Sequence, residues 1–238
     1  QAVSIQPQAH GAQQRCQVLH QGAGRRWWLG RGIRHGPIVR MLGPARAGSY
    51  THDSPLTTYE HTSMQTRCAL VGMPGSGKST VGRQLARRLG LPFIDMDHLL
   101  EQRLGCSISS FFEQHGEPAF RDHETALLAE LAAESGDMVL STGGGVVLRP
   151  ENRAALRQGF SHVMYLRASP DEIYKRVRHS QTRPLLQVAD PQARLRELYR
   201  TRDPLYREAA HYVIETGRPT VNTLVNMIVM QLEMAPGA

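Results

Sequence analysis

The sequence has little of what marks a membrane, secreted or zinc-binding protein. No apolar run approaches the ~18 consecutive residues of a membrane-spanning helix. The three cysteines, Cys16, Cys68 and Cys106, lie far apart and form no CxxC pair. We therefore expect three unrelated thiols, no disulfide framework and a reducing compartment. The 11 histidines form no metal-spaced cluster, so no structural zinc is expected. These absences predict a cytoplasmic protein with no membrane partner.

Acidic residues are scarce in the first quarter of the chain and ordinary elsewhere. Residues 1–66 hold 7 arginines, no lysine and 2 acids, a net charge of 7 − 2 = +5. Residues 67–238 hold 21 basic and 19 acidic residues, a net charge of +2. The overall charge of +7 therefore belongs mostly to the N-terminal quarter. The remainder is balanced, as in an ordinary enzyme, and no nucleic-acid partner is expected.

The N-terminal quarter also lacks an apolar period that could build a core. Its best apolar run is Trp27–Leu29, and glycine and proline interrupt the segment repeatedly. We expect residues 1–65 to be a disordered or non-native leader. The chain starts with Gln, and both Met41 and Met64 are possible starts. A targeting peptide and a basic arm for nucleic acid are the alternatives. The folded domain is predicted to span residues 66–238.

The glycine-rich segment Gly72–Ser79 fits the phosphate-loop pattern G-x-x-x-x-G-K-[ST]. A buried strand is predicted before it at Cys68–Val71, and an amphipathic helix after it up to Leu89. Glycines let backbone N–H groups turn towards phosphate oxygens, and the helix N-terminus adds positive potential. Lys78 would reach the β- and γ-phosphates and the Ser79 hydroxyl would ligate Mg²⁺. The predicted ATP contacts are Gly75, Ser76, Gly77, Lys78, Ser79 and Thr80.

Two carboxylates follow the next predicted strand, Leu91–Asp97. Ligands of open α/β sheets bind beyond the carboxyl ends of strands, so Asp95 and Asp97 are expected near the triphosphate. An acid there can hold Mg²⁺ through water or accept a proton from an attacking hydroxyl. The alternative is that Asp97 only caps the helix Asp97–Leu104.

Two further segments carry polar or glycine-rich features. A helix is predicted from Pro118 to Glu134, on which Arg121 and Glu124 are neighbours three residues apart and would pair on the surface. A strand at Met138–Ser141 runs into three consecutive glycines. Such a run indicates close approach of a ligand or another backbone, and a flexible connector is the alternative.

The rest of the chain continues the alternation of strands and helices. Strands are predicted at Val163–Leu166 and His211–Ile214, and helices at Asp171–Arg178, Pro191–Ala210 and Thr220–Leu232. This alternation predicts an α/β domain of three layers, with a parallel sheet covered by helices on both faces. Tyr199, Tyr206 and Tyr212 are interpreted as packing residues.

Six of these stretches together resemble the shikimate kinase family, whose fold is that of a nucleoside-monophosphate-kinase-like P-loop enzyme. The stretches are GMPGSGKST (Gly72–Thr80), FIDMD (Phe93–Asp97), GEPAFRDHE (Gly116–Glu124), STGGG (Ser141–Gly145), TRPLL (Thr182–Leu186) and RDPLYRE (Arg202–Glu208). They occur in the family's order over about residues 66–233. The phosphate loop is shared with many kinases and GTPases, whereas the set as a whole is far more specific.

On the acceptor side, the resemblance implies that Asp97 binds substrate hydroxyls and acts as the base. Arg121 and Arg202 match the pair that grips the substrate carboxylate. Two arginines also suit bidentate, charge-assisted capture of a carboxylate. The glycines Gly143, Gly144 and Gly145 match the backbone that approaches the substrate ring.

On the nucleotide side, Asp95 matches the acid that contacts Mg²⁺ through water. Arg183 matches an arginine on a mobile lid that closes over the phosphates, and the sequence around it is polar, as expected of a lid. Arg176 matches an arginine that stacks on adenine. The long leader departs from the family's pattern, and the late adenine-contacting position near Arg218 aligns only loosely.

The resemblance implies ATP-dependent phosphorylation of the 3-hydroxyl of shikimate in aromatic amino-acid biosynthesis, with Mg²⁺ as cofactor. ATP and shikimate are the expected partners, and a monomer is expected. One alternative is a kinase for another small polyol acid such as gluconate. A second is a nucleotide-dependent regulatory protein whose basic leader binds nucleic acid.

Overall fold

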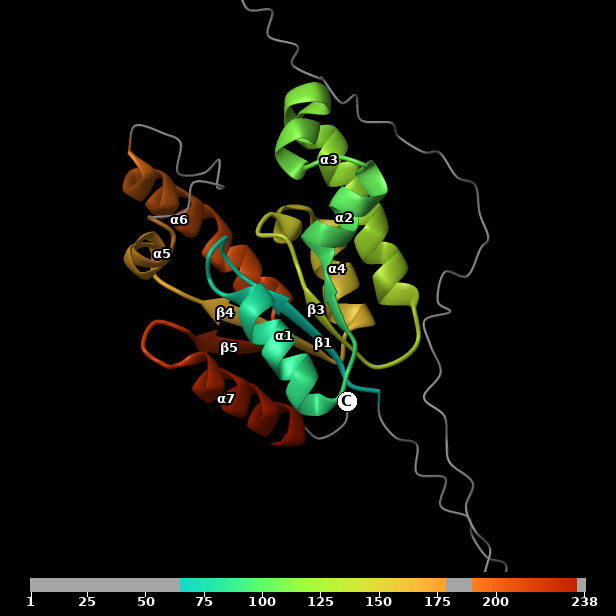
Figure 1. The fold of residues 1–238 in the computed structure, drawn as a ribbon, viewed down its shortest axis with the longest axis vertical. Helices are drawn as coiled ribbons and strands as arrows, with labels where there is room; N and C mark the ends of the chain where they lie inside the picture. The colour runs from blue at the N-terminus through green and yellow to red at the C-terminus, as the bar shows by residue number, and fades with distance from the viewer. Residues whose placement is uncertain (1–64, 179–189, 235–238) are drawn as a thin grey trace, which may run out of the picture. The chain divides into compact units, whose positions relative to one another are not determined.

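The structure, a computed structural model, describes residues 65–178 and 190–234. The predicted leader and the segment around Arg183 lie outside the described residues, so their expected states and the division into domains stay predictions. Figure 1 shows the described elements. They are β1 (Arg67–Val71), α1 (Lys78–Leu89), β2 (Phe93–Asp95), α2 (Met96–Leu104), α3 (Ile108–Ala133), β3 (Met138–Ser141), the 3₁₀ turn η1 (Val146–Leu148), α4 (Pro150–Gly159), β4 (His162–Arg167), α5 (Pro170–Val177), α6 (Pro191–Ala209), β5 (Tyr212–Glu215) and α7 (Val221–Met234).

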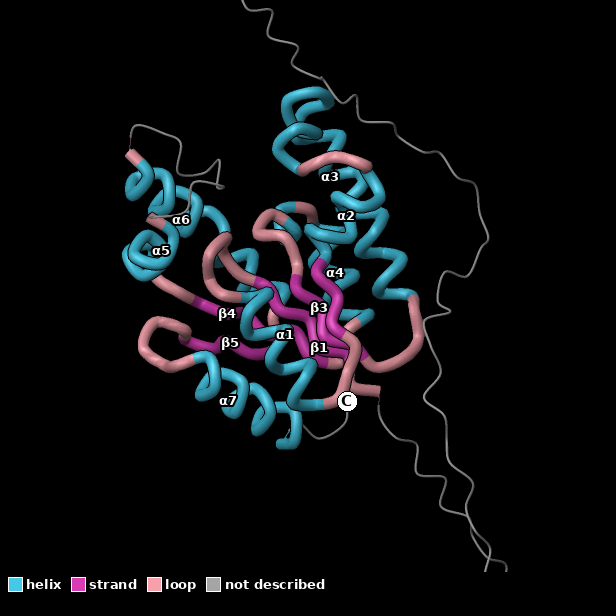
Figure 2. The backbone as a smooth tube through the Cα atoms, in the orientation of Figure 1, coloured by secondary structure: helices cyan, strands magenta, loops and turns pink. Residues whose placement is uncertain are grey.

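The strands form one parallel sheet in the order β2-β3-β1-β4-β5 (Figure 2). In the centre, Ala69 of β1 is in register with Leu140 of β3 on one side and Val163 of β4 on the other. Short apolar strands separated by helical crossovers form such a sheet because each crossover returns the chain to the end of the sheet at which the previous strand began. The predicted parallel α/β architecture is confirmed.

Alternate side chains of each strand enter two different cores. On β1, Cys68 and Leu70 join the core beneath α1 and α7, whereas Ala69 and Val71 join the core beneath α2 to α6. Figure 1 shows α1 and α7 together on one face of the sheet. Successive side chains of a strand point to opposite faces of the sheet, so each face is apolar and is covered by helices. This gives the predicted three layers. In the described part of the chain, no helix is both long and apolar enough to cross a membrane.

Helix boundaries follow local capping and glycine geometry. Helix α3 begins at Ile108, ten residues before the predicted start, because Ser107 accepts the Ser110 amide and caps a first segment. Gly116, at φ 80°, has non-helical geometry and kinks the helix just before Pro118. The sequence signals that predicted a helix start at Pro118 therefore mark a kink inside a longer helix.

At the amino ends of the strands, Arg67 ties β1 to the surrounding loops. Its guanidinium donates to the carbonyls of Leu131 (2.6 Å), Gly159 (2.7 Å) and Gly136 (3.1 Å). The carbon at its centre lies 5.1 Å from the centre of the Phe160 ring. This arginine is buried at 7% exposure, and its partners are all fixed backbone or ring atoms.

The cysteines differ from the prediction. Cys68 is free and buried on β1, where burial raises the pKa of its thiol to about 12. Cys106 is disulfide-bonded, so the expectation of three unrelated thiols is wrong for this residue.

Candidate active site

The predicted functional residues converge on the carboxyl ends of three neighbouring strands. Strand β3 lies between β2 and β1, so the segments that follow these strands share one edge of the sheet. The phosphate loop follows β1, Asp97 follows β2, and the glycine triplet Gly143–Gly145 follows β3. This is where ligands bind in open α/β sheets.

The phosphate loop turns tightly into α1. Gly77 is the N-cap of this helix at φ 100°, a left-handed conformation that glycine adopts without steric cost. The Ser76 amide donates to the Met73 carbonyl at 3.1 Å. Lys78, buried at 8% exposure, donates from Nζ to the carbonyls of Gly72 (2.8 Å) and Met73 (3.1 Å). The lysine ammonium is thus held inside the loop, at the start of the helix.

Oxygen ligands suited to a hard cation meet beside this loop. The hydroxyls of Ser79 and Ser141 lie 3.2 Å apart, and Asp95 is in register with Ser141 in the sheet. Hydroxyl and carboxylate oxygens are the ligands that Mg²⁺ prefers. Within residues 65–178 and 190–234, no group of three or more His, Cys, Asp or Glu side chains forms a metal cage. A site completed by phosphate oxygens and water fits these residues.

Asp97 lies in the first turn of α2, not at its cap. The N-cap is Asp95, whose side chain makes no capping hydrogen bond. The interpretation of Asp97 as a simple helix cap is therefore wrong. Burial raises the pKa of its carboxyl above the ordinary value of 3.8, and the charges of Asp95 and Glu101 raise it further. Lys78 and Arg121 oppose this rise in pKa without cancelling it.

The glycine triplet allows the closest approach of three segments. A Cβ atom added to Gly143 would lie 2.7 Å from Oδ1 of Asp97 and 2.8 Å from Oε1 of Glu124. One added to Gly145 would overlap the guanidinium of Arg121. Any side chain here would therefore displace charged groups of the site, which argues against a flexible connector.

The hydrogen bonds of the triplet leave its amides facing no protein acceptor. The Gly143 and Gly145 carbonyls accept the amides of Val146 (3.3 Å) and Leu148 (3.0 Å). The Gly144 carbonyl accepts two side-chain donors that are described below. In the described ranges, the structure assigns no protein acceptor to the three glycine N–H groups. The triplet thus presents backbone donors, which suits an anionic or hydroxyl-rich ligand.

Arg121 and Glu124 form a buried pair. Their ion pair is 2.6 Å long, with the side chains 13% and 1% exposed, so the predicted surface pairing is wrong. Glu117, 56% exposed, holds the other edge of the guanidinium, at 2.7 Å. Burial raises the pKa of Glu124, and nearby Asp97 raises it too, although Arg121 and Arg202 lower it.

Sequence reasoning missed Glu124 as a site residue. The signal was present, because Glu124 falls in the apolar stripe of α3 formed by Phe120, Leu127, Leu128 and Leu131, all buried. A lone acid in such a stripe needs a buried partner, since an unpaired charge is costly there.

Arg202, on α6, reaches the glycine triplet from the opposite side. Its Nη1 donates to the Gly144 carbonyl at 3.0 Å. The next residue, Asp203, accepts hydrogen bonds from Tyr165 (2.8 Å), Arg167 (3.1 Å) and Arg207 (2.8 Å). These bonds tie α6 to β4 and set the position from which Arg202 approaches.

Arg176, on α5, lies over the phosphate loop. Its Nη1 donates to the Ser76 carbonyl at 3.2 Å and to the Thr216 hydroxyl at 3.3 Å, and Nη2 donates to the Thr216 carbonyl. The structure therefore brings the predicted nucleotide-side residues of the described ranges to one place. Arg183 lies outside the described residues.

Comparisons with known proteins agree with this geometry. The family model for shikimate kinase matches residues 74–233. A shikimate kinase of Paracidovorax citrulli is 62% identical over 168 residues, covering 70% of this chain and 91% of that relative. One of Ralstonia nicotianae is 59% identical over 165 residues, covering 69% of this chain and 86% of the relative.

A solved structure, shikimate kinase from Acinetobacter baumannii in complex with shikimate, has a TM-score of 0.68 and 42% identity. The match covers 71% of this chain and 94% of that one. The six motifs, the sheet order and the convergence at one edge of those motif residues that the structure describes have the same explanation. The chain belongs to the shikimate kinase family.

Proposed function

We propose that this chain transfers the γ-phosphoryl group of ATP to the 3-hydroxyl of shikimate. One observation carries the proposal. The half-buried carboxylate of Asp97 lies between the lysine of a phosphate loop and a glycine triplet that two arginines contact. Such a site offers a base, a phosphate cradle and a carboxylate clamp together. Family membership supports the same reaction.

The nucleotide side rests on Gly75–Thr80. Backbone amides at the start of α1 and the Lys78 ammonium would stabilise the charge that spreads over the phosphoryl oxygens. Arg176 would cover the adenine, because it already bridges the phosphate loop and Thr216. Arg183 is proposed to close over the phosphates.

Asp97 would orient the attacking hydroxyl and accept its proton. A carboxyl with a raised pKa is a stronger base than an ordinary aspartate, which favours proton transfer. Because the ionised form is the active one, turnover should fall as pH drops through that raised pKa. Lys78 lowers the pKa of this carboxyl, which opposes the effect of burial and favours the ionised form.

The substrate carboxylate would be bound by Arg121 and Arg202. Glu117 holds the Nε and Nη2 edge of Arg121, which is the edge that forms bidentate bonds with carboxylates. The substrate would take this position and leave the buried Glu124 in place. The amides of Gly143–Gly145 would then contact substrate oxygens.

Mg²⁺ fits the oxygen atoms of Ser79 and Asp95, with Asp95 acting through water. When bound, the ion would neutralise negative charge on the phosphates of ATP. Ser141 keeps the Ser79 hydroxyl oriented through their hydrogen bond. We further propose that the chain works as a cytoplasmic monomer, in which one chain supplies the phosphate loop, the glycine triplet and both arginines.

The direct test is ADP release by the purified full chain with MgATP. Turnover should require shikimate and should stay at background with gluconate. Turnover with gluconate alone would favour the polyol-acid kinase. ATP binding without turnover on either acid would favour a regulatory protein. Light scattering on the same sample tests the monomer.

A further inference from the structure

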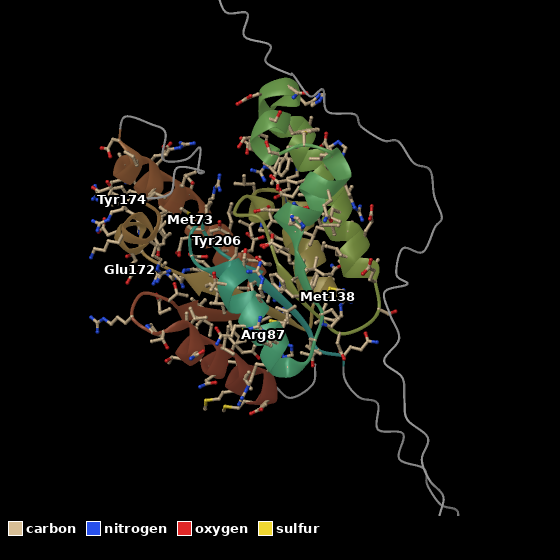
Figure 3. The ribbon with its side chains drawn as sticks, viewed as in Figure 1. Met73, Arg87, Met138, Glu172, Tyr174 and Tyr206 are labelled. Atoms are coloured by element: carbon tan, nitrogen blue, oxygen red, sulfur yellow. The ribbon has the colours of Figure 1, made fainter. Side chains whose placement is uncertain are left out.

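The Gly144 carbonyl accepts two side-chain donors from α6, one turn apart. Besides Arg202, the hydroxyl of Tyr206 donates to it, at 2.5 Å. Tyr206 is fully buried, and burial raises the pKa of its hydroxyl, which therefore remains a donor at any working pH. Figure 3 labels Tyr206 near Met73 of the phosphate loop, with which it shares a core.

Peptide geometry extends this contact to the substrate side. The Gly144 carbonyl and the Gly145 amide belong to one peptide unit, and the described chain contains no cis peptide. In a planar trans unit the carbonyl and the N–H point in opposite directions. Whatever holds the carbonyl against α6 therefore aims the Gly145 N–H away from α6. The guanidinium of Arg121 lies close to the α-carbon of the same glycine.

The two donors are not equivalent. Arg202 is a proposed ligand of the substrate carboxylate, so its guanidinium must serve the substrate as well as the carbonyl. Tyr206 has no proposed role in binding the carboxylate. Its ring stacks on Tyr165 with centres 4.9 Å apart, and its hydroxyl donates to Gly144. Tyr165 is itself held through its hydroxyl to Asp203.

We propose that Tyr206 is a positioning residue for the acceptor substrate. It holds the Gly144 carbonyl, fixes the direction of the Gly145 amide and leaves Arg202 available to the carboxylate. The inference deepens the proposed function and rests on it. It also corrects the interpretation of Tyr206 as packing alone.

The variant Tyr206→Phe keeps the ring and removes only the donor. We expect the KM for shikimate to rise about tenfold, with the KM for ATP changed less than twofold. The control Tyr212→Phe removes a tyrosine hydroxyl on β5, at a residue that takes no part in the bonds to Gly144 or Asp203. It should leave the KM for shikimate within twofold.

A second measurement is independent of turnover. In ¹⁵N-labelled protein, Tyr206→Phe should shift the Gly145 amide resonance, and Tyr212→Phe should not. An unchanged KM for shikimate, an equal rise in the KM for ATP, or an unmoved Gly145 resonance would each overturn the positioning role. Wild-type protein that ignores shikimate would instead refute the proposed function, while the resonance would still test the geometry.

Discussion

Each end of the sheet buries an arginine, and the two arginines have opposite kinds of partners. At the amino end, Arg67 binds three backbone carbonyls and packs on a phenylalanine ring. At the carboxyl end, Arg121 binds two glutamates, one buried and one largely exposed. Backbone carbonyls cannot leave, whereas an exposed carboxylate can be exchanged for another carboxylate. The first arrangement closes the fold, and the second suits a binding site.

The same contrast applies to the glycines. Gly136, at the amino end, has φ 112° and nothing within 4 Å of an added Cβ. Gly143, at the carboxyl end, needs no left-handed backbone, but an added Cβ would meet the carboxylates of Asp97 and Glu124. One glycine is required by backbone conformation and the other by crowding. Changes at the two ends should therefore separate stability from catalysis.

The largest expected effect is that of Lys78→Ala at the carboxyl end. We expect kcat to fall about 10³-fold, because a preorganised positive charge at the phosphoryl group is lost. Steady-state kinetics at saturating ATP measures this. A kcat near that of the wild type would contradict the assignment of the phosphate loop.

Arg67→Ala is the corresponding change at the amino end. Three backbone carbonyls, one buried and two half-buried, lose a donor, so the free energy of unfolding should fall by about 3 kcal/mol. Urea denaturation measures the loss, and kcat of the protein that remains folded should match the wild type. If kcat fell and stability stayed, the division of roles between the two ends would be wrong.

Substitutions at Gly136 and Gly143 test the same separation of stability from catalysis. Gly143→Ala should lower kcat/KM about 10²-fold, since it displaces Asp97 from its working position. Gly136→Ala should leave kinetics alone and lower the free energy of unfolding by about 1 kcal/mol, the cost of alanine in a left-handed conformation. Measuring both quantities on both variants tests the claim, which equal kinetic losses would refute.

Substitutions of the two glutamates that pair with Arg121 should change the KM for shikimate by different amounts, and the effects should be smaller than those above. Glu124→Gln removes the buried partner, and we expect the KM for shikimate to rise about tenfold as Arg121 loses its position. Glu117→Gln is the matched change at the exposed partner. It should lower the KM for shikimate slightly or leave it unchanged, because it removes a competitor. Equal effects of the two variants would mean that burial does not distinguish them.

Sequence patterns predicted the parallel sheet and the phosphate loop because both depend on local signals: short apolar runs, a glycine-rich turn and helical periodicity. The start of α3 was missed, since Pro118 resembles a helix start although the kink arises at Gly116. Glu124 was missed because the three-residue spacing from Arg121 was interpreted as a surface pair, although the apolar stripe of α3 marked that face as buried. Tyr206 was interpreted as packing because packing is the default for a tyrosine in such a segment, and only the fold brings its hydroxyl to Gly144.

The smallest expected effect concerns the pH dependence set by Asp97. The pKa of its carboxyl is raised by burial and by Asp95, so the acid limb of kcat/KM for shikimate should lie above pH 3.8. Asp95→Asn removes a neighbouring negative charge, which stabilises the ionised form of Asp97 and should move this limb to lower pH. Asp122→Asn, at an exposed carboxylate paired with Arg149, is the control and should leave the limb in place. A limb that moves equally in both variants would show that the titrating base is a group other than Asp97. The contrast between the two ends of the sheet would then concern binding and stability, and would not extend to proton transfer.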